Sequence, residues 1–416
     1  MKVVILSEYF HPDNSGGTPT ELSDLAAALK ARHTELVLDV ITSSNLYRSP
    51  MPKGGLPRRE SWAGMTITRL RVPKSNRPSM ALRLFFGGIF ALATLVELMR
   101  RPRYDLIFVV TNPPGLAGAT WFYHQLTRVP YLYLVHDLYP DIAIAMGRVQ
   151  ADGWFARSFA RSQRGWLRSS SKVVVLGRCM KEYLIQHYGL VEQHVRVISS
   201  WSAISSEDPA AGENEFRRQL DHSGTVVLYA GNLSEYVRID RFLAAARLLS
   251  SRPDILFVFI GDGAMKQSLA HEIASQRFEN VRLLPRVPRD RMGSVLAGCD
   301  IALVSLDQRM LGLGVPSKLY GILAAGRAVL AVMPEQSEVA RVLQEEDCGV
   351  NVSAGTPERI AAEIVRLADS RVRLEELGRN AQAAVRAKYS IDDACGKYWS
   401  EFKQLVEASA SAPNIK

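Results

Sequence analysis

The stretch Gly312-Leu-Gly-Val-Pro-Ser-Lys-Leu-Tyr-Gly-Ile-Leu-Ala-Ala-Gly-Arg-Ala-Val-Leu-Ala331 predicts a glycine-rich loop, a short helix and a buried strand. Pro316 and Ser317 suit the start of a helix, and Gly326 suits the position just after its end. Lys318 falls in the first turn, where the helix dipole disfavours a cation. An anion bound at the free N–H groups of the helix start would explain that placement. The alternative is a surface lysine whose stem lies along the protein.

The same alternation of strand, loop and helix extends over both halves of the 416-residue chain. Such alternation predicts parallel sheets covered by helices. We therefore expect an α/β protein with two Rossmann-like domains that face each other across an interdomain cleft. The apolar runs of strand length lie at residues 3–6, 36–42, 105–110 and 131–135 in the first half and at 225–230, 255–260, 281–284 and 300–304 in the second. The expected boundaries are 1–203 for the N-terminal domain, 204–223 for a polar linker, 224–390 for the C-terminal domain and 391–416 for a final amphipathic helix.

Composition is that of an ordinary globular protein, with 47% hydrophobic and 22% charged residues. The four cysteines form no Cys-x-x-Cys pair, so neither a zinc site nor a disulfide scaffold is indicated. A reducing cytoplasm fits this cysteine usage best. The first strand carries no small-residue cleavage site, so a secretory signal is not expected.

The basic residues are concentrated in the first half of the chain. Residues 1–200 carry 25 Lys and Arg against 14 Asp and Glu, whereas the remainder carries 26 against 28. An anionic membrane surface, a phosphorylated acceptor or nucleic acid would each suit this excess. No zinc-finger or RNA-binding signature favours nucleic acid, and we expect none as a partner.

Residues 81–99 form an apolar segment flanked by arginines. Its uncharged run, Leu84 to Val96, has 13 residues, whereas a spanning helix needs about 20. We therefore expect a helix that lies on a membrane surface, and peripheral attachment to the inner membrane. A helix of the protein core is the alternative.

Two polar turns in the first half are candidate ligand contacts. Gly16 and Gly17 precede Thr18-Pro-Thr-Glu21, which reads as a capping box. Their spacing is not Gly-x-Gly-x-x-Gly, so a tight turn is about as good an explanation as phosphate binding. His136 and Asp137 follow the strand at 131–135, and ligands in open α/β sheets bind beyond such strand ends. The alternative is that Asp137 merely caps the next helix.

Taken together, these motifs resemble family 4 glycosyltransferases, which are retaining enzymes with two Rossmann-like domains. The branch that they resemble includes bacterial colanic-acid and O-antigen transferases, among them those for N-acetyl-L-fucosamine. The resemblance spans nearly the whole chain and implies that the final helix packs back on the N-terminal domain. The motifs that carry it are Gly16-Gly17, His136-Asp-Leu-Tyr-Pro140, Val175-Leu-Gly-Arg-Cys-Met180, Tyr229-Ala-Gly-Asn232, Ile260-Gly-Asp-Gly263, Ala297-Gly-Cys-Asp300 and Val315–Gly326.

This sequence departs from the family at an important motif. The wider family carries Glu-x7-Glu across the opening loop and helix, and the aligned positions here are Leu313 and Gly321. The second glutamate of the family grips the donor ribose, so another group must replace it. Glu335 and Glu338 are candidates, although a glutamate in a loop is usually solvated.

The resemblance implies transfer of a sugar from a nucleoside diphosphate donor, UDP-sugar being the expected one, to a glycan or a polyprenyl-diphosphate-linked acceptor in bacterial surface polysaccharide synthesis. No Asp-x-Asp occurs, so neither a metal nor another cofactor is expected, and protein groups must neutralise the leaving diphosphate. The residues with implied catalytic roles are Asp137, His136, Lys318 and Arg238. The residues with implied donor contacts are Gly16, Gly17, Asn232, Gly261, Asp262, Arg286, Val287, Ser317, Lys318 and Glu338.

Two other functions stay open at this point. A catalytically inactive nucleotide-sugar-binding scaffold would explain the lost glutamate pair. A nucleotide-sugar epimerase would share the two-domain architecture and interconvert donors without an acceptor. A dinucleotide dehydrogenase is disfavoured, because no Gly-x-Gly-x-x-Gly follows either first strand.

Overall fold

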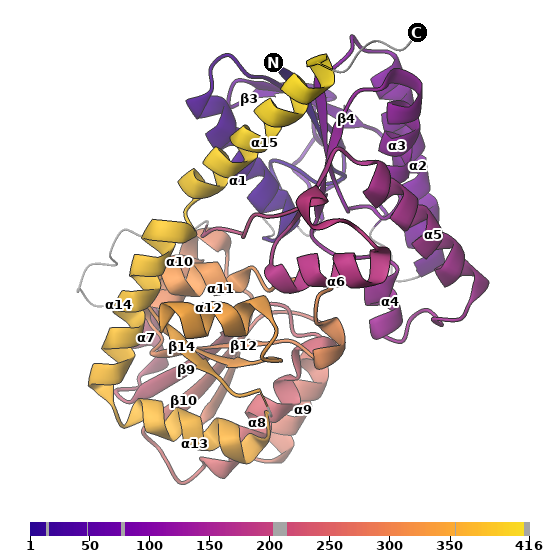
Figure 1. The fold of residues 1–416 in the computed structure, drawn as a ribbon. Helices are drawn as coiled ribbons and strands as arrows, with labels where there is room; N and C mark the ends of the chain where they lie inside the picture. The colour runs from indigo at the N-terminus through magenta and orange to yellow at the C-terminus, as the bar shows by residue number, and fades with distance from the viewer. Residues whose placement is uncertain (14–15, 48, 76–79, 203–213, 354, 412–416) are drawn as a thin grey trace. The chain divides into compact units, whose positions relative to one another are not determined.

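Strands of the chain assemble into two separate sheets, one in each of two units. The computed structural model describes residues 1–13, 16–47, 49–75, 80–202, 214–353 and 355–411. The N-terminal unit consists of Met1–Ser199, Gly312–Gly314 and Ile391–Lys416, and the C-terminal unit of Ser200–Leu311 and Val315–Ser390 (Figure 1). These two mostly parallel α/β units confirm the predicted fold class. The interdomain cleft stays a prediction.

The N-terminal unit is built on an eight-stranded sheet of order β3-β4-β2-β1-β5-β6-β7-β8. Its strands are β1 (Lys2–Leu6), β2 (Val37–Ser43), β3 (Arg59–Trp62), β4 (Met65–Leu70), β5 (Leu106–Val110), β6 (Tyr131–Val135), β7 (Lys172–Val175) and β8 (Val195–Val197). The central strand β1 pairs in parallel on both sides, with Val3 opposite Leu38 of β2 and Leu106 of β5. Among the described strands of this sheet, only β3 pairs antiparallel, with β4. Helices cover both faces, which is why the inner strands are continuous apolar runs.

The helices of this unit are α1 (Thr18–Arg32), α2 (Met80–Met99), α3 (Leu116–Thr127), α4 (Asp141–Ala145), α5 (Trp154–Ser169), α6 (Arg178–Tyr188) and α15 (Ile391–Ser411), with a 3₁₀ turn η1 (Glu192–His194). Helix α3 packs between α2 and α5 (Figure 1). These three helices therefore form a continuous layer.

The C-terminal helix α15 completes the core of the N-terminal unit. It packs along α1, and its Tyr398 and Phe402 lie 5.5 and 5.6 Å from Phe108 of β5, measured between ring centroids. His33 and Trp399 stack at 3.8 Å. The buried carboxylate of Glu401 lies 3.4 Å from Arg196. Aromatic burial and this ion pair hold the helix in place.

The C-terminal unit has a six-stranded sheet of order β11-β10-β9-β12-β13-β14, in which every pair is parallel. Its strands are β9 (Thr225–Ala230), β10 (Ile255–Ile260), β11 (Val281–Leu284), β12 (Ile301–Ser305), β13 (Ala328–Val332) and β14 (Gly349–Asn351). Numbered from β9, this order is the 3-2-1-4-5-6 arrangement of dinucleotide-binding folds.

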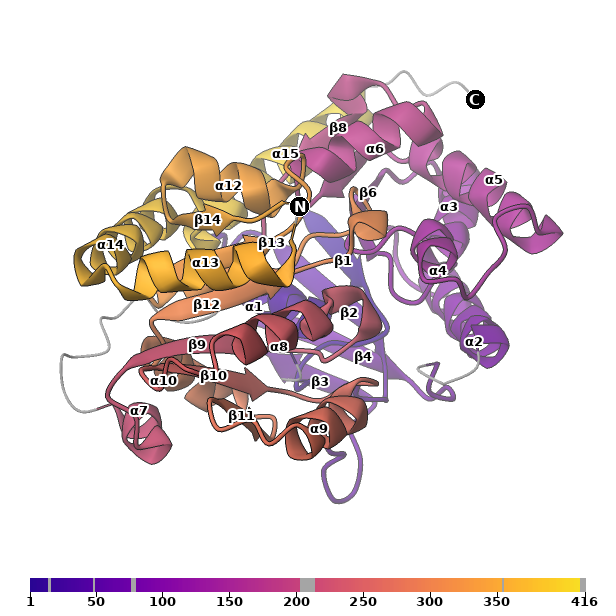
Figure 2. The same cartoon turned by 90° about the horizontal axis from the view of Figure 1, so that it is seen from below.

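Helices cover both faces of this sheet over separate apolar cores. Helices α8 and α13 pack side by side on one face (Figure 2), and α11 packs on the other. The helices are α7 (Glu215–Leu220), α8 (Ile239–Leu248), α9 (Lys266–Ser275), α10 (Arg289–Ala297), α11 (Lys318–Ala324), α12 (Glu338–Glu346), α13 (Pro357–Ala368) and α14 (Arg371–Lys388), with 3₁₀ turns η2 (Glu235–Val237) and η3 (Gln308–Met310).

The second half of the segment 204–223, which was expected to be a linker, contains a helix. Residues 204–213 lie outside the described residues, but α7 follows them directly. The Asn214 side chain caps α7 by accepting the N–H of Arg217, and Phe216 is buried in the core of the C-terminal unit. One apolar side chain and an N-cap were enough to order a polar segment as a helix.

Helix α2 is longer than its uncharged run. It covers 20 residues, and the window Leu82–Met99 has a mean hydropathy of 1.8 with a third of it buried. The helix includes the charged Glu97, whose buried carboxylate pairs with the Arg101 guanidinium at 2.8 Å. Among the described residues, α2 is the one helix long and apolar enough to cross a membrane. Core helices share this length and composition, so these two properties do not by themselves make α2 a membrane span.

Candidate functional site

The carboxyl ends of β9 and β12 mark the point where the strand order of the C-terminal unit reverses. Open α/β sheets bind ligands in the crevice at such a switch point. Gly231 follows β9, and Asp307 follows β12 by two residues. The N–H of Asp307 donates to the carbonyl of Tyr236 at 2.7 Å, which ties the two loops together. These loops form the candidate site.

Glycines allow the loops after β9 and β10 to approach closely. A Cβ on Gly261 would lie 1.8 Å from the carbonyl oxygen of Gly231, and one on Gly263 would lie 2.2 Å from that of Leu233. Only glycine fits such contacts. The N–H of Leu233 also donates to the carbonyl of Asp262 at 3.0 Å. The structure thus brings Gly261 and Asp262, both predicted donor residues, against the β9 loop.

Lys318 is the first residue of α11, and its amine lies against the end of β9. Nζ is 3.8 Å from the centroid of the Tyr229 ring, and a Cβ on Gly231 would come within 2.6 Å of it. This nitrogen is covered from solvent and has no hydrogen-bond partner among the described residues. Desolvation lowers the pKa of Lys318 to about 7. The aromatic face stabilises a cation there, but no counter-charge from the described residues satisfies it.

Arg238, in contrast, is already paired. Its backbone is left-handed, with φ 55°. Its guanidinium donates to Asp240 at 2.8 Å and lies 3.9 Å from Asp307. Hydrogen bonding to Asp240 raises its pKa. Asp307 also pairs with Arg309 at 2.9 Å, and hydrogen bonding from Arg309 lowers the pKa of Asp307. A phosphate would have to compete with these carboxylates for Arg238.

Two more predicted donor residues, Asn232 and Ser317, lie near this point together with Asp262. The side-chain amide of Asn232 donates to the Tyr236 hydroxyl at 3.3 Å, and the backbone carbonyl of Asn232 accepts from the Tyr229 hydroxyl at 2.8 Å. Asp262 is exposed and pairs with Lys266 at 2.5 Å. Ser317 directly precedes α11, but its side chain makes no cap hydrogen bond.

The remaining predicted donor residues are farther from the switch point in the strand order. Arg286 is exposed and Val287 packs on the core, and both follow β11, the edge strand that lies two strands from β9. Glu338 is buried in the first turn of α12, where Ser337 caps the helix by accepting from Ala340. The other candidate, Glu335, accepts from Ser353 at 3.1 Å.

In the N-terminal unit, Gly16 and Gly17 lead into α1 with φ 82° and 68°. A Cβ at either position would meet no atom of a described residue within 4 Å, so the backbone conformation and not space favours glycine. The predicted capping box is wrong. Thr18 is already helical and Gly17 is the N-cap, so no side chain caps α1.

His136 lies at the end of β6 beside a carboxylate that the sequence did not pair with it. Nδ1 of His136 is 4.0 Å from Glu21 of α1, and both side chains are about 10% exposed. Nε2 is buried without a hydrogen-bond partner among the described residues. Desolvation lowers the pKa of His136 to about 4, so the imidazole is neutral at pH 7. The hydroxyl of Thr111 accepts the N–H of His136 at 3.2 Å and fixes the turn.

Asp137 is open to solvent on the same turn. The surrounding protein raises the pKa of its carboxyl to about 6 by desolvation. It does not cap α4, which begins at Asp141 without a side-chain cap. A Cβ on Gly314 would lie 3.5 Å from Oδ1 of Asp137.

The segment 312–314 of the opening motif packs on this turn. The carbonyl of Leu313 accepts the N–H of Leu138 at 3.1 Å, and the Leu313 side chain is 3% exposed. The position aligned with a family glutamate is therefore a buried apolar anchor.

Within the described part of the chain, no group of three or more His, Cys, Asp or Glu side chains is arranged to hold a metal ion.

Two domain families match the chain in succession. The family described as "Glycosyl transferase 4-like domain" matches residues 16–201, and "Glycosyl transferases group 1" matches residues 212–384. Among curated relatives, the probable glycosyltransferase WbjE of Pseudomonas aeruginosa is 28% identical over 82% of the chain and 84% of the relative. The putative colanic acid biosynthesis glycosyl transferase WcaI of Escherichia coli is 25% identical over 69% and 72%.

Solved structures share the fold at low identity. The Anabaena protein HepE in complex with UDP has a TM-score of 0.71 at 15% identity, covering 97% of this chain and all of that one. WaaG, a glycosyltransferase involved in lipopolysaccharide biosynthesis, has a TM-score of 0.69 at 15% identity, covering 99% and 100%.

Proposed function

Because the chain belongs to the glycosyltransferases that join a 4-like domain to a group 1 domain, we propose that it moves a sugar from a UDP-sugar to a glycan or polyprenyl-diphosphate-linked acceptor, with retention of configuration. The names of WbjE and WcaI support a role in bacterial surface polysaccharide synthesis. The UDP complex of HepE supports the choice of donor. The observation that carries the proposal is the buried amine of Lys318, unpartnered among the described residues, at the switch point of the C-terminal unit.

We propose that the donor diphosphate is the missing counter-charge of Lys318. A diphosphate would raise the pKa of the amine by favouring its charged form. The developing charge on the leaving UDP would then be stabilised by protein groups without a metal or other cofactor. Arg238 would contact the diphosphate only if its ion pairs with Asp240 and Asp307 were broken. Gly231 and Gly261 let the two loops and the Lys318 amine pack closely together, which would hold the amine where the diphosphate binds.

The turn at the end of β6 is our proposed acceptor and sugar contact. His136 is neutral and held by Thr111, which suits a hydrogen-bond partner for a hydroxyl. Asp137 presents a solvent-reachable carboxylate whose raised pKa suits proton exchange near neutral pH. Gly17 would offer its backbone N–H to phosphate, whereas the N–H of Gly16 already donates to the Thr20 hydroxyl at 3.1 Å.

The test is release of UDP from a panel of UDP-sugars, with and without membrane lipid extract as acceptor source. We expect slow hydrolysis of one donor and faster release when lipid extract is present. Binding without any turnover would instead support the inactive scaffold, which the buried Leu313 at a family glutamate position favours. Conversion of one UDP-sugar into another without UDP release would identify an epimerase.

We also propose peripheral attachment to the cytoplasmic side of the inner membrane through the N-terminal unit. Its α2–α3–α5 layer exposes large apolar side chains, with Phe85 63%, Leu126 57% and Trp154 80% exposed. This unit also carries the basic excess of the chain. Each basic residue near an anionic surface contributes about 1 kcal/mol.

The full chain should therefore sediment with vesicles that contain acidic phospholipid at low salt and be released at about 1 M salt, where the screening length falls to about 3 Å. Vesicles of phosphatidylcholine alone are the control. Retention through high salt and carbonate would contradict peripheral attachment, and no sedimentation at low salt would contradict membrane binding.

A further inference from the structure

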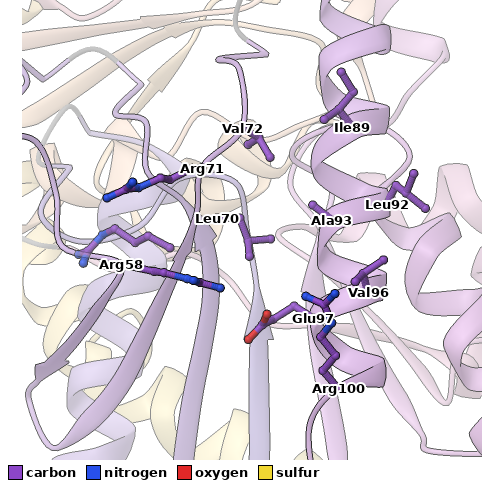
Figure 3. Close-up of a pocket in the computed structure, with 11 residues that line it drawn as sticks. Arg58, Leu70, Arg71, Val72, Ile89, Leu92, Ala93, Val96, Glu97 and Arg100 are labelled. Carbon is purple, nitrogen blue, oxygen red and sulfur yellow. The ribbon is translucent and has the colours of Figure 1, made fainter.

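A groove between β4 and α2 has two chemically different sides. It has a volume of about 730 Å³, within the roughly 300–1,000 Å³ of small-molecule sites. Leu70 and Val72 form its floor at the end of β4, while Ile89, Ala93 and Val96 project from α2 (Figure 3). The groove lies wholly within the N-terminal unit and is separate from the His136 turn.

The strand side and the lower end of the groove are basic. Arg58 and Arg71 line the strand side, and Arg100 lies at the end of α2 (Figure 3). All three residues are exposed. Their guanidinium groups make no ion pair or side-chain hydrogen bond to any residue that the structure describes. Three cations are therefore available to a ligand.

The other charges of the groove are compensated internally. Glu97 pairs with Arg101 at 2.8 Å, and the buried Arg69 pairs with Glu60 at 2.6 Å. The groove consequently keeps the positive charge of its three exposed arginines, and an anion is the complementary ligand.

The helix side is apolar and solvent-accessible. Leu92 is 63% exposed and Val96 is 40% exposed. Contiguous exposed apolar surface on a protein commonly marks a binding site, and here it lies beside unpaired arginines. An amphiphile would cover both at once, with its hydrocarbon on α2 and its anionic group on the arginines.

We propose that this groove binds one acidic phospholipid molecule, with the headgroup phosphate at Arg58 and Arg71 and one acyl chain along Ile89, Ala93 and Val96. Arginine binds phosphate oxygens through two parallel N–H donors, which gives the headgroup a defined position. The proposal refines the membrane attachment proposed above by naming a single-lipid site within the attached face.

The probe is dihexanoyl phosphatidylglycerol, titrated calorimetrically into the full chain below the concentration at which this lipid forms micelles. We expect saturable binding of one lipid per chain. Dihexanoyl phosphatidylcholine, which has the same chains but no net charge, should bind at least tenfold more weakly. Glycerol 1-phosphate, which has a phosphate but no chains, should also bind at least tenfold more weakly.

Two variants separate the halves of the site. Arg58→Gln combined with Arg71→Gln should weaken phosphatidylglycerol about tenfold or more, since charge-assisted contacts are lost. Ala93→Phe should fill the chain groove and abolish binding, with thermal unfolding as a check on folding. Arg157→Gln, an exposed arginine on α5, is the matched control and should leave binding unchanged.

Equal affinity for the choline lipid would overturn the headgroup assignment, and equal affinity for glycerol phosphate would reduce the groove to an anion site. Unchanged binding in the double arginine variant would also refute the lipid site. So would a dimer of the wild type that Ala93→Phe dissociates, because this face would then join two copies of the chain. UDP release is measured on the same variants. If the variants lose lipid binding but keep UDP release, the transferase proposal is unaffected. If lipid binds as expected but no UDP is released, the lipid-site proposal is unaffected.

Discussion

Replacing Asp137 by asparagine should lower sugar transfer about a hundredfold or more while UDP binding is kept. The asparagine would retain the shape of the side chain but could not accept a proton or hold a negative charge. A positioned acid–base group contributes about 10²- to 10⁴-fold to a rate. The helix-capping alternative is already excluded, because α4 begins at Asp141 without a side-chain cap. The measurement is UDP release with lipid extract, alongside calorimetric titration with UDP.

The pH profile gives a second readout for Asp137. Its pKa is raised to about 6, so the carboxylate becomes protonated as the pH falls through that value. Transfer by the wild type should decline below about pH 6, and Asp137→Asn should lack this limb. Asp152→Asn, an exposed aspartate on another loop of the same unit, is the control. Unchanged transfer in Asp137→Asn would remove this residue from the reaction.

Replacing Lys318 by methionine should weaken UDP binding about ten- to a hundredfold. The variant keeps the apolar stem over Tyr229 and removes only the charge. Charge-assisted hydrogen bonds to phosphate contribute about 1.5–3 kcal/mol, which corresponds to that range of affinity. Lys318→Arg should recover only part of it, because a planar guanidinium does not fit where the amine contacts Gly231.

The effect should also depend on pH. Desolvation lowers the pKa of the empty site to about 7, so the amine is largely neutral at pH 8 and must take up a proton when a diphosphate binds. UDP affinity of the wild type should therefore fall as the pH rises above about 7, and that of Lys318→Met should not fall in the same way. Below pH 7 the buried charge disfavours the empty folded state, so Lys318→Met should not lower the thermal unfolding temperature there.

Lys388→Met is the matched control, because Lys388 is an exposed lysine of the same unit that pairs with Glu346. If Lys318→Met bound UDP with wild-type affinity at every pH, Lys318 would have no part in donor binding, and its role would be the structural contact with the Tyr229 ring.

The sheets were predictable because their strands are buried on both faces. Such strands are continuous apolar runs, and residues 225–230, 255–260 and 281–284 coincide with β9, β10 and β11. Helices with clear ends were equally predictable. In α13, for example, Thr356 caps the first turn and Pro357 follows it, and both are standard signals of a helix start.

Local rules failed where tertiary contacts decide. The Thr18–Glu21 pattern suggested a capping box, but Glu21 turns toward His136, which follows β6, instead. These residues are far apart in the sequence, and neither helical nor strand periodicity links them. Helix α7 formed in a polar segment because a single Phe216 reaches the core.

The position of Lys318 at the start of a helix was predictable, but its electrostatic surroundings were not. The motif around Lys318 indicated an anion at a helix start, but the contact with Tyr229 joins α11 to β9 across the sheet. Burial lowers the pKa values of Lys318 and His136, and the burial of a single side chain cannot be inferred from the spacing of residues in the sequence. The pairing of Arg238 with Asp307 likewise depends on the loop after β12.

Helix α15 is the last described element along the sequence, yet it belongs to the N-terminal unit. Domains generally fold as units, the N-terminal one first, while the chain is still being made. Here the N-terminal unit lacks its last helix until residues 391–411 have been synthesised, because Tyr398 and Phe402 cover Phe108 of β5. During translation of the C-terminal unit, the nascent N-terminal unit therefore carries an uncovered aromatic face. A ribosome that stops before residue 391 leaves that face permanently open to chaperones and proteases.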